Sequence, residues 1–278
     1  MKASNLLNEL SEYITIKING CTEIYHDRQW SENKAHKDYD LWYITAGHVN
    51  IEINGICFQA NSGDVMLFCP DVQYSASNGT RECRFIYLHF DLSIGNNFRI
   101  LDEFSLPAVI PAEAIETEAF VFRKSFEQYR DILPMSSIYL KGGFTMLLAR
   151  ILDFCCSENN PRIFPVVNDT RKNAGKLAIL QPVINYISEH LGRPLRVAEL
   201  SSLTGMSEKY FISYFKRILG ISPGQYIHQL KMNRAREYLY QKRFSVKEIS
   251  NMLGYPDPYT FSKAFKKYYK LPPSRFVQ

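Results

Sequence analysis

Residues 205–226 read GMSEKYFISYFKRILGISPGQY, and residues 254–276 read GYPDPYTFSKAFKKYYKLPPSRF. The second stretch repeats the first at an offset of about 50 residues, and such self-similarity at one offset indicates an internal duplication. Two phenylalanines four residues apart, a basic pair, a proline and a closing aromatic residue recur in the same order. The last third of the chain therefore contains two copies of one structural unit.

Each copy has the pattern of a short helix, a glycine turn and a second helix. In the first copy, over residues 196–219, Gly205 permits the sharp turn and Ser207 is the expected N-cap of the second helix. The second copy, over residues 245–269, opens with a capping box and turns at Gly254. This order of elements predicts two helix-turn-helix units.

The repeated phenylalanines must face the core, which leaves an outward face on each second helix. Side chains on that face can reach base edges in a major groove, and those near the helix end can contact phosphates. The predicted DNA contacts are Lys209, Ile212, Ser213, Lys216 and Arg217 in the first unit, and Pro258, Tyr259, Ser262, Lys263 and Lys266 in the second. Because the two sets differ, we expect each protomer to recognise an asymmetric site.

Charge is unevenly distributed along the chain. Residues 177–278 carry 16 Lys and Arg against 6 Asp and Glu, a net +10, whereas residues 1–176 carry 17 against 22, a net −5. A basic module indicates a polyanionic partner. We expect a cytoplasmic protein with no membrane partner, because the chain has neither an apolar run long enough to span a bilayer nor a signal peptide. No C-x-x-C pair predicts a zinc site.

The two copies resemble the two halves of the AraC/XylS-type DNA-binding domain. The residues that carry the resemblance are Gly205, Phe211, Phe215, Ser222 and Pro223 in the first half, and Ile249, Gly254, Tyr255, Phe261 and Pro273 in the second. The resemblance implies a transcription regulator that binds double-stranded DNA, and RNA polymerase as a partner if the protein is an activator. It also implies an N-terminal cupin-like domain for sensing and dimerisation.

The residues of the N-terminal half independently predict short strands. Apolar and polar residues alternate over residues 84–90, and Asn54-Gly55 lies between two isoleucines as in a tight hairpin. Several short strands separated by turn residues predict a small β-barrel or sandwich over residues 14–110. The resemblance favours the barrel.

Residues 113–156 read as two helices separated by Pro134. Their apolar faces need a partner, which is either the barrel or a second subunit. For a homodimer, the predicted contacts are Ile138, Phe144, Leu147, Leu148 and Ile151. The fold class is therefore α+β, organised as a sensor and dimerisation domain over residues 1–156, a linker over 157–175 and an all-helical DNA-binding domain over 176–278.

A small-molecule effector is expected inside the barrel. Phe85, Tyr87 and His89 share one face of their strand, and comparison with sugar-sensing relatives of the family turns that face inward. The same comparison places Arg28 and Trp30 among the ligand contacts. Aromatic rings with an arginine and a histidine suit a sugar or a small anion. The alternative is a filled barrel without a ligand.

The sequence predicts no catalytic residue, metal or cofactor. Metal-dependent cupins need a His-x-His pair, a glutamate and a further histidine, whereas here His26, His36, His48 and His89 occur singly. Two alternatives to a ligand-modulated regulator stay open. One is control by a protein partner or by dimerisation alone, and the other, with less support, is a cupin-type enzyme fused to a DNA-binding tail.

Overall fold

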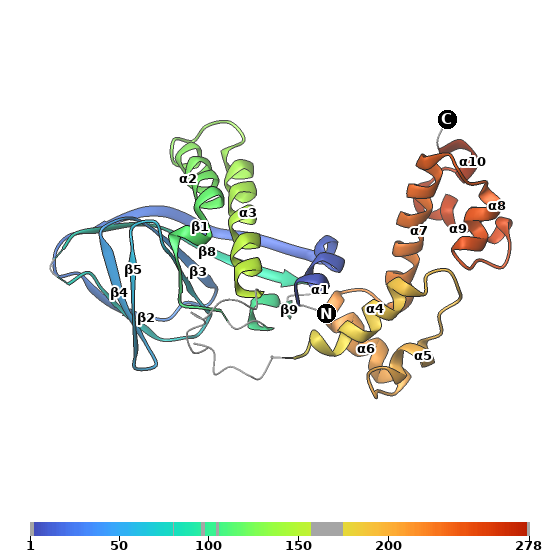
Figure 1. Cartoon of the computed structure of the whole chain (residues 1–278), viewed down its shortest axis with the longest axis horizontal. Helices are drawn as coiled ribbons and strands as arrows, with labels where there is room; N and C mark the ends of the chain where they lie inside the picture. Colours follow the sequence, from blue (N-terminus) through green and yellow to red (C-terminus); the bar gives the residue numbers. More distant parts are fainter. Residues whose placement is uncertain (1–2, 80, 96–97, 104–105, 157–174, 277–278) are drawn as a thin grey trace. The chain divides into compact units, whose positions relative to one another are not determined.

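The computed structural model describes residues 3–79, 81–95, 98–103, 106–156 and 175–276. The chain divides into two units, Met1–Gly175 and Lys176–Gln278, drawn in Figure 1. The predicted linker lies outside the described residues except for Gly175. No helix in the described part of the chain is long and apolar enough to cross a membrane.

Two antiparallel sheets form most of the N-terminal unit. The larger has the strand order β1-β8-β3-β6-β10, with β9 paired to β8, and the smaller has the order β2-β7-β4-β5. The larger sheet consists of β1 (Ile14–His26), β3 (Tyr39–Ala46), β6 (Val65–Phe68), β8 (Cys83–Ile94), β9 (Phe98–Arg99) and β10 (Val109–Ile110). The smaller consists of β2 (Ser31–Lys34), β4 (His48–Ile53), β5 (Ile56–Asn61) and β7 (Tyr74–Ser77). Strands thus occupy the whole segment in which they were predicted.

The hairpin between β4 and β5 shows how local sequence sets the register. Asn54 and Gly55 have φ angles of 51° and 77°, which are the positive values that a tight type I′ turn requires. The turn pairs Ile53 with Ile56. The hairpin predicted from Asn54-Gly55 is therefore confirmed.

An aromatic core fills the space between the two sheets. Trp42 of β3 stacks on Phe85 of β8 with ring centroids 4.3 Å apart. Phe68 of β6 packs against Tyr74 of β7 at 4.4 Å, so the core joins strands of both sheets. The same buried cluster includes Val49, Ile51, Ile53, Phe58, Ala60 and Ala76. These contacts close the two sheets into the small barrel that the resemblance implied.

Two long helices cover the outer face of the larger sheet (Figure 1). They are α2 (Glu116–Arg130) and α3 (Ser136–Cys156). Phe144 of α3 contacts Phe90 of β8 with ring centroids 4.8 Å apart, and Phe122 of α2 contacts Tyr43 of β3 at 6.4 Å. Strand β8 is consequently covered on both faces, by the barrel core on one side and by helices on the other.

This packing corrects the predicted dimer contacts. Gly143 lets the helices approach closely, since a Cβ there would lie 2.5 Å from Ser125 Oγ and 3.2 Å from Phe122 Cα. Within the protomer, α3 buries Phe144, Leu147, Leu148 and Ile151, each at most 2% exposed. These four side chains pack on the barrel and on α2, so they are not available to a partner subunit. Among the predicted dimer residues, Ile138 is 69% exposed.

The remaining described helices form the C-terminal unit, apart from α1 (Ala3–Glu9) and the short 3-10 turns of the N-terminal unit. They are α4 (Gln181–Glu189), α5 (Val197–Ser202), α6 (Glu208–Leu219), α7 (Pro223–Gln241), α8 (Val246–Met252), α9 (Pro258–Tyr269) and α10 (Pro273–Phe276), preceded by the 3-10 turn Ala178–Leu180. The pairs α5–α6 and α8–α9 occupy the two predicted helix-turn-helix segments.

Local capping bonds explain where these helices begin. Ser207 accepts a hydrogen bond from the Tyr210 N–H at the start of α6, and Ser245 forms a complete capping box with Glu248 at the start of α8. The turns within the two pairs use Gly205 and Gly254, each with a φ of 66°. Each of these turns and caps was expected from residues close to it in the sequence.

Candidate DNA-binding surface and effector cavity

Helix α6 presents a polar and basic face to solvent. Phe211 and Phe215 are fully buried on its inner side. The five residues predicted to contact DNA are all exposed: Lys209, Ile212, Ser213, Lys216 and Arg217. Tyr210 is also exposed, at 53%, and was missed. The helical period could have indicated it, because a residue at this position shares a face with the positions three and seven further on.

Helix α9 presents a different face. Asp257 caps it by accepting a hydrogen bond of 2.7 Å from the Thr260 N–H. Tyr259 is 77% exposed, Lys263 and Lys266 are exposed, and Pro258 and Ser262 are half-buried. The two helices thus bring all ten predicted residues to the surface or its edge. Helix α6 offers the aliphatic Ile212 together with Tyr210, whereas α9 offers Tyr259.

A buried lysine ties the two helix-turn-helix units together. Lys231 of α7 is 8% exposed, and its Nζ donates to the carbonyl oxygens of Leu253 at 2.6 Å and Arg193 at 3.1 Å. Leu253 ends the first helix of the second unit, and Arg193 precedes the first unit. Burial lowers the pKa of Lys231. No residue close to Lys231 in the sequence predicts this contact.

The turn of the second unit packs against the same segment. A Cβ on Gly254 would lie 2.5 Å from the Cα of Arg193. Helix α7 itself has 19 residues, which corresponds to a length of about 28 Å. The spacing of successive major grooves is about 34 Å. The length of α7 is therefore comparable to the spacing of neighbouring grooves.

The barrel contains a cavity of about 210 Å³ between its two sheets. Three predicted ligand residues line it, namely Phe85, Tyr87 and His89. Trp30 stacks on His26, another lining residue, at 3.9 Å. Arg28 does not line the cavity, because it lies in the turn after β1 and is exposed. Its contact with an effector stays a prediction. The other lining residues are Ile24, Glu32, Lys34, His36, Asp40, Trp42 and Tyr74.

A polar cluster lies in this cavity. Asp40 of β3 is the cross-strand partner of His89 of β8, and His36 lies in the β2–β3 connection. The Asp40 Oδ2 atom is 3.6 Å from His36 Nε2 and 3.9 Å from His89 Nε2. Asp40 is 1% exposed, and its Oδ1 has no hydrogen-bond partner among the described residues. The two histidines that occur singly in sequence thus meet at one carboxyl group.

Burial sets the protonation of this cluster. It raises the pKa of Asp40 to about 7, although the charge of His89 and a hydrogen bond from Trp42 oppose the shift. That bond joins Trp42 Nε1 to Asp40 Oδ2 at 2.7 Å. Burial also lowers the pKa of His36, and His89 adds to the effect. The imidazole of His36 is therefore neutral at pH 7, and Asp40 is poised between its two protonation states.

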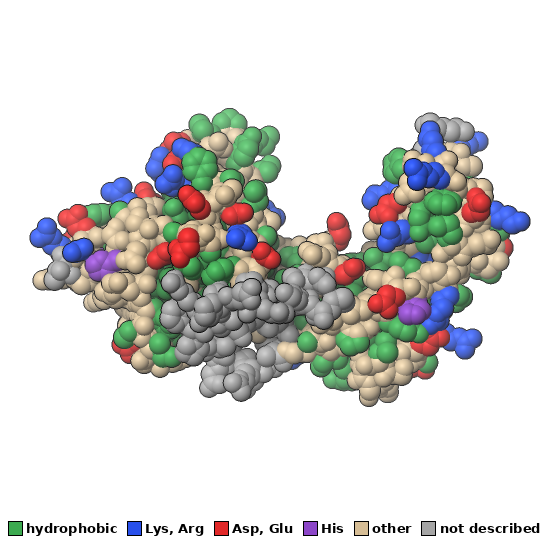
Figure 2. Space-filling view, in the orientation of Figure 1, with side chains coloured by type: hydrophobic (Ala, Val, Ile, Leu, Met, Phe, Trp, Pro, Cys, Tyr) green, Lys and Arg blue, Asp and Glu red, His purple; other side chains and the backbone are tan. Residues whose placement is uncertain are grey.

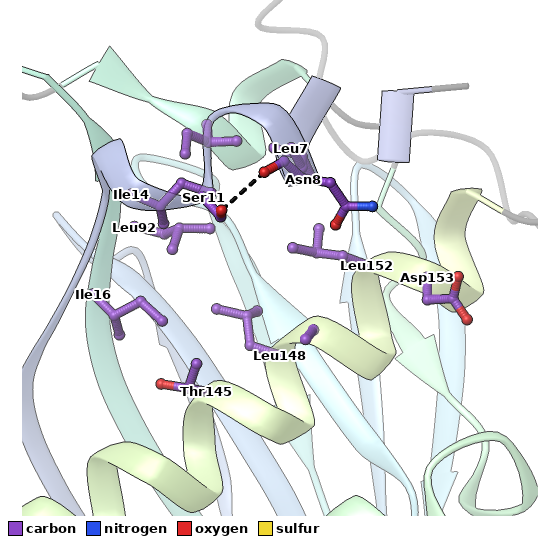
Figure 3. Close-up of a pocket in the computed structure, with 12 residues that line it drawn as sticks. Leu7, Asn8, Ser11, Ile14, Ile16, Leu92, Thr145, Leu148, Leu152 and Asp153 are labelled. Carbon is purple, nitrogen blue, oxygen red and sulfur yellow. Dashed lines mark hydrogen bonds between the residues drawn. The ribbon is translucent and has the colours of Figure 1, made fainter. Parts of the chain in front are cut away.

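A second cavity, of about 390 Å³, lies between the N-terminal segment and α3. Figure 3 shows that its walls are mostly leucine and isoleucine side chains. The Ser11 hydroxyl donates to the Asn8 carbonyl at 2.8 Å, and the Thr145 hydroxyl donates to the Lys141 carbonyl at 2.6 Å. Because these polar groups are already satisfied, the barrel cavity is the better candidate for a polar effector.

Two family models match the chain. Residues 18–118 match the AraC-like ligand binding domain, and residues 200–278 match a helix-turn-helix domain. The chain belongs to the AraC family of transcription regulators. The expected cupin-like fold and the double helix-turn-helix are both confirmed by these matches together with the described strands and helices.

Curated relatives carry names of transcription regulators. The Msm operon regulatory protein of Streptococcus mutans is 26% identical over 90% of this chain and 88% of its own length. The raffinose operon regulatory protein RafR of Pediococcus pentosaceus is 32% identical over 34% of each chain. The lactose operon transcription activator of Staphylococcus xylosus is 26% identical over 45% of this chain and 43% of its own. The last two matches span less than half of the relatives.

Proposed function

We propose that this AraC-family regulator reads an asymmetric DNA site with α6 and α9 lying in neighbouring major grooves. The observation that carries the proposal is the pair of exposed, non-identical faces on two capped helices of a basic unit. Ile212 offers an aliphatic contact for a thymine methyl group, whereas Tyr259 offers an aromatic one. Lys216 and Lys266, near the helix ends, supply phosphate contacts.

Lysine substitutions test this assignment. Lys216→Ala and Lys266→Ala are expected to weaken binding to all duplexes and to reduce the slope of log affinity against log salt by about 1 each. Lys209→Ala and Lys263→Ala are expected to relax sequence preference, at a cost of about 1–3 kcal/mol on the preferred duplex. Fluorescence anisotropy of the full chain on duplexes selected from a random pool measures both effects.

Lys141→Ala is the matched control, because it removes one exposed charge from α3 in the other unit. It should leave affinity and salt slope unchanged. Equal effects of Lys141→Ala and Lys216→Ala would contradict the assignment of α6 to DNA.

We further propose that a small sugar binds in the barrel cavity and modulates an activator. Aromatic rings and charged side chains line this cavity together, which is the combination that sugars require. Its volume is below the range usual for drug-sized ligands, which favours a small molecule. Two relatives are named for the raffinose and lactose operons, one of them as an activator. An activator would also contact RNA polymerase.

The two tryptophans report on this cavity. Trp42 lines it, and Trp30 stacks on His26 at its wall, and the chain has two tryptophans in all. An effector from a panel of mono- and oligosaccharides should change the intrinsic fluorescence of the full chain and release heat in calorimetry. Tyr87→Ala should abolish both signals, whereas Tyr25→Ala, at an exposed barrel position, should not. If no sugar of the panel changes the fluorescence or releases heat, the result would count against a sugar as the effector.

We propose that the tip of the α2–α3 hairpin pairs two subunits. Hydrophobic side chains gather there (Figure 2). Ile132, Met135 and Ile138 are 87%, 69% and 69% exposed, and an apolar patch of this kind marks an interaction surface. A homodimer is the expected assembly of such a regulator.

Charge insertion tests the dimer surface. Ile138→Glu combined with Met135→Glu should convert the full chain to a monomer in light scattering, because it places two carboxylates in the apolar contact. Ile56→Glu, at an exposed position of the β4–β5 hairpin, is the control and should stay dimeric. A wild-type chain that is monomeric at tens of micromolar would rule the dimer out.

A further inference from the structure

We propose that His36, Asp40 and His89 form a binding site for one divalent transition-metal ion inside the barrel. The three side chains each offer one ligand atom, and these atoms lie within 4.8 Å of one another. Two imidazoles and one carboxylate with open positions are a ligand set that Fe²⁺ and Zn²⁺ accept. The inference is independent of the DNA-binding proposal, since it concerns the barrel alone.

The spacing of the ligand atoms fits a metal better than it fits hydrogen bonds. The N···O distances from Asp40 Oδ2 to His36 and His89 are 3.6 and 3.9 Å, which exceed ordinary hydrogen-bond length. Ligand atoms around a metal with bonds of about 2.1 Å are about 3.0–3.4 Å apart. The ligand atoms of the whole cluster lie within 4.8 Å of one another, so a contraction of a few tenths of an ångström for the closest pair and up to about 1.8 Å for the widest would complete the site.

The second observation is the unsatisfied carboxyl oxygen of Asp40. This side chain is 1% exposed, and its Oδ1 lacks a hydrogen-bond partner among the described residues. A buried carboxyl oxygen without a hydrogen-bond partner costs about 1–3 kcal/mol, and the family's DNA-binding chemistry gives no reason to keep it. A bound cation would supply the missing compensation. Trp42 meanwhile donates to the other oxygen at 2.7 Å and fixes the carboxyl orientation.

The neighbouring groups orient the two histidines. His89 Nδ1 lies 3.1 Å from Asp38 Oδ1, so Nδ1–H can donate to that carboxylate and leave Nε2 free, as in many carboxylate–histidine–metal arrangements. Coordination by His36 requires the tautomer with its proton on Nδ1. The Tyr74 hydroxyl, 3.0 Å from His36 Nε2, donates to Glu32 Oε1 at 2.9 Å and so has an alternative partner.

Three protein ligands leave coordination positions open towards the cavity. A molecule with adjacent hydroxyl groups, or with a hydroxyl and a carboxylate, would fill them. The binding of such a molecule to the metal rests on the proposed sugar effector, whereas the metal site itself does not. Lys34 and Glu32 also line the cavity and offer further contacts to such a ligand.

Metal binding to the full chain tests the proposal. The chain is stripped with a chelator, dialysed against Co²⁺ or Zn²⁺, and analysed for bound metal and for the visible absorption of Co²⁺. Wild type should bind one ion per chain. His36→Gln, His89→Gln and the isosteric Asp40→Asn should each weaken binding at least about tenfold, and Asp38→Asn should do so by about 10–100-fold through His89.

His26→Gln is the matched control, because His26 lines the same cavity but lies outside the cluster; it should bind metal as wild type does. Far-ultraviolet circular dichroism and the urea unfolding midpoint establish that each variant keeps a folded barrel, because the tryptophans themselves contact Asp40 and His26. A wild-type chain without stoichiometric metal, or equal losses in His26→Gln and His89→Gln, would overturn the site. DNA binding measured in the same chelator-treated sample separates this failure from a failure of the regulator assignment.

Discussion

Replacing Lys231 with methionine is expected to lower the affinity for a complete DNA site at least about tenfold while both recognition helices stay folded. Methionine keeps the apolar stem but removes the ammonium that bridges the carbonyls of Arg193 and Leu253. Leaving such buried acceptors unpaired costs about 1–3 kcal/mol each. The two helix-turn-helix units then lose part of their fixed relative orientation. Binding of the first unit to DNA consequently gives the second unit a lower effective concentration at its own half-site.

The spacing of the DNA site distinguishes this mechanism from a general loss of charge. Inserting one base pair between the two half-sites should cost wild type more affinity than Lys231→Met, because the variant is no longer held at one separation. Lys247→Met is the control, since it removes an exposed charge from α8 without a buried contact. Equal affinities of the two variants, with equal sensitivity to the insertion, would show that Lys231 does not set the geometry.

The double helix-turn-helix could be predicted because its signals are local. Ser207 and Asp257 cap their helices through bonds to residues three positions away, and Gly205 and Gly254 set their turns by their own φ angles. Such caps and turns depend on neighbouring residues in the sequence, so they can be predicted without knowledge of the tertiary fold. The exposed faces of α6 and α9 followed from the same helical period.

The polar cluster in the barrel could not be predicted in the same way. His36 and His89 meet because β3 lies beside β8 in the larger sheet and pairs Asp40 with His89. That pairing joins segments about fifty residues apart, and strand order in a barrel is not set by local sequence. Considering each histidine as an isolated residue therefore missed the cluster, and the same non-locality hid the contacts of Lys231.

Four of the five predicted dimer contacts are buried within the protomer, and the physical reason differs from that for the polar cluster. An apolar stripe on a helix shows that the helix is covered, but it does not identify what covers it. Phe144 and Leu147 of α3 have the stripe expected of a subunit interface, yet they are buried on their own barrel and on α2. Among the exposed apolar residues near the hairpin tip, Ile138 lies in α3 and was predicted, whereas Ile132 and Met135 lie in the turn, where helical periodicity carries no information.

Replacing Gly254 with alanine is expected to destabilise the C-terminal unit by about 3 kcal/mol, whereas Gly205→Ala should cost only about 1 kcal/mol. Both glycines have a φ of 66°, so both substitutions incur the same left-handed backbone penalty of about 1–2 kcal/mol. Nothing lies within 4 Å of a Cβ on Gly205, but a Cβ on Gly254 would lie 2.5–2.7 Å from backbone atoms of Arg193. Overpacking of this kind adds about 1–3 kcal/mol.

Urea denaturation of the full chain can separate the two units within one sample. Both tryptophans lie in the barrel, so their fluorescence follows the N-terminal unit. The far-ultraviolet circular dichroism reports α2 and α3 together with α4 to α10, so the part of the helical transition that does not coincide with the fluorescence follows the C-terminal unit. The fluorescence midpoint should stay constant in both variants, and the helical midpoint should fall much further in Gly254→Ala. Equal helical midpoints would mean that backbone strain alone decides the cost, and that the second turn does not rest on Arg193. A larger shift for Gly254→Ala would show that the turn of the second unit packs against the segment around Arg193 that Lys231 also binds.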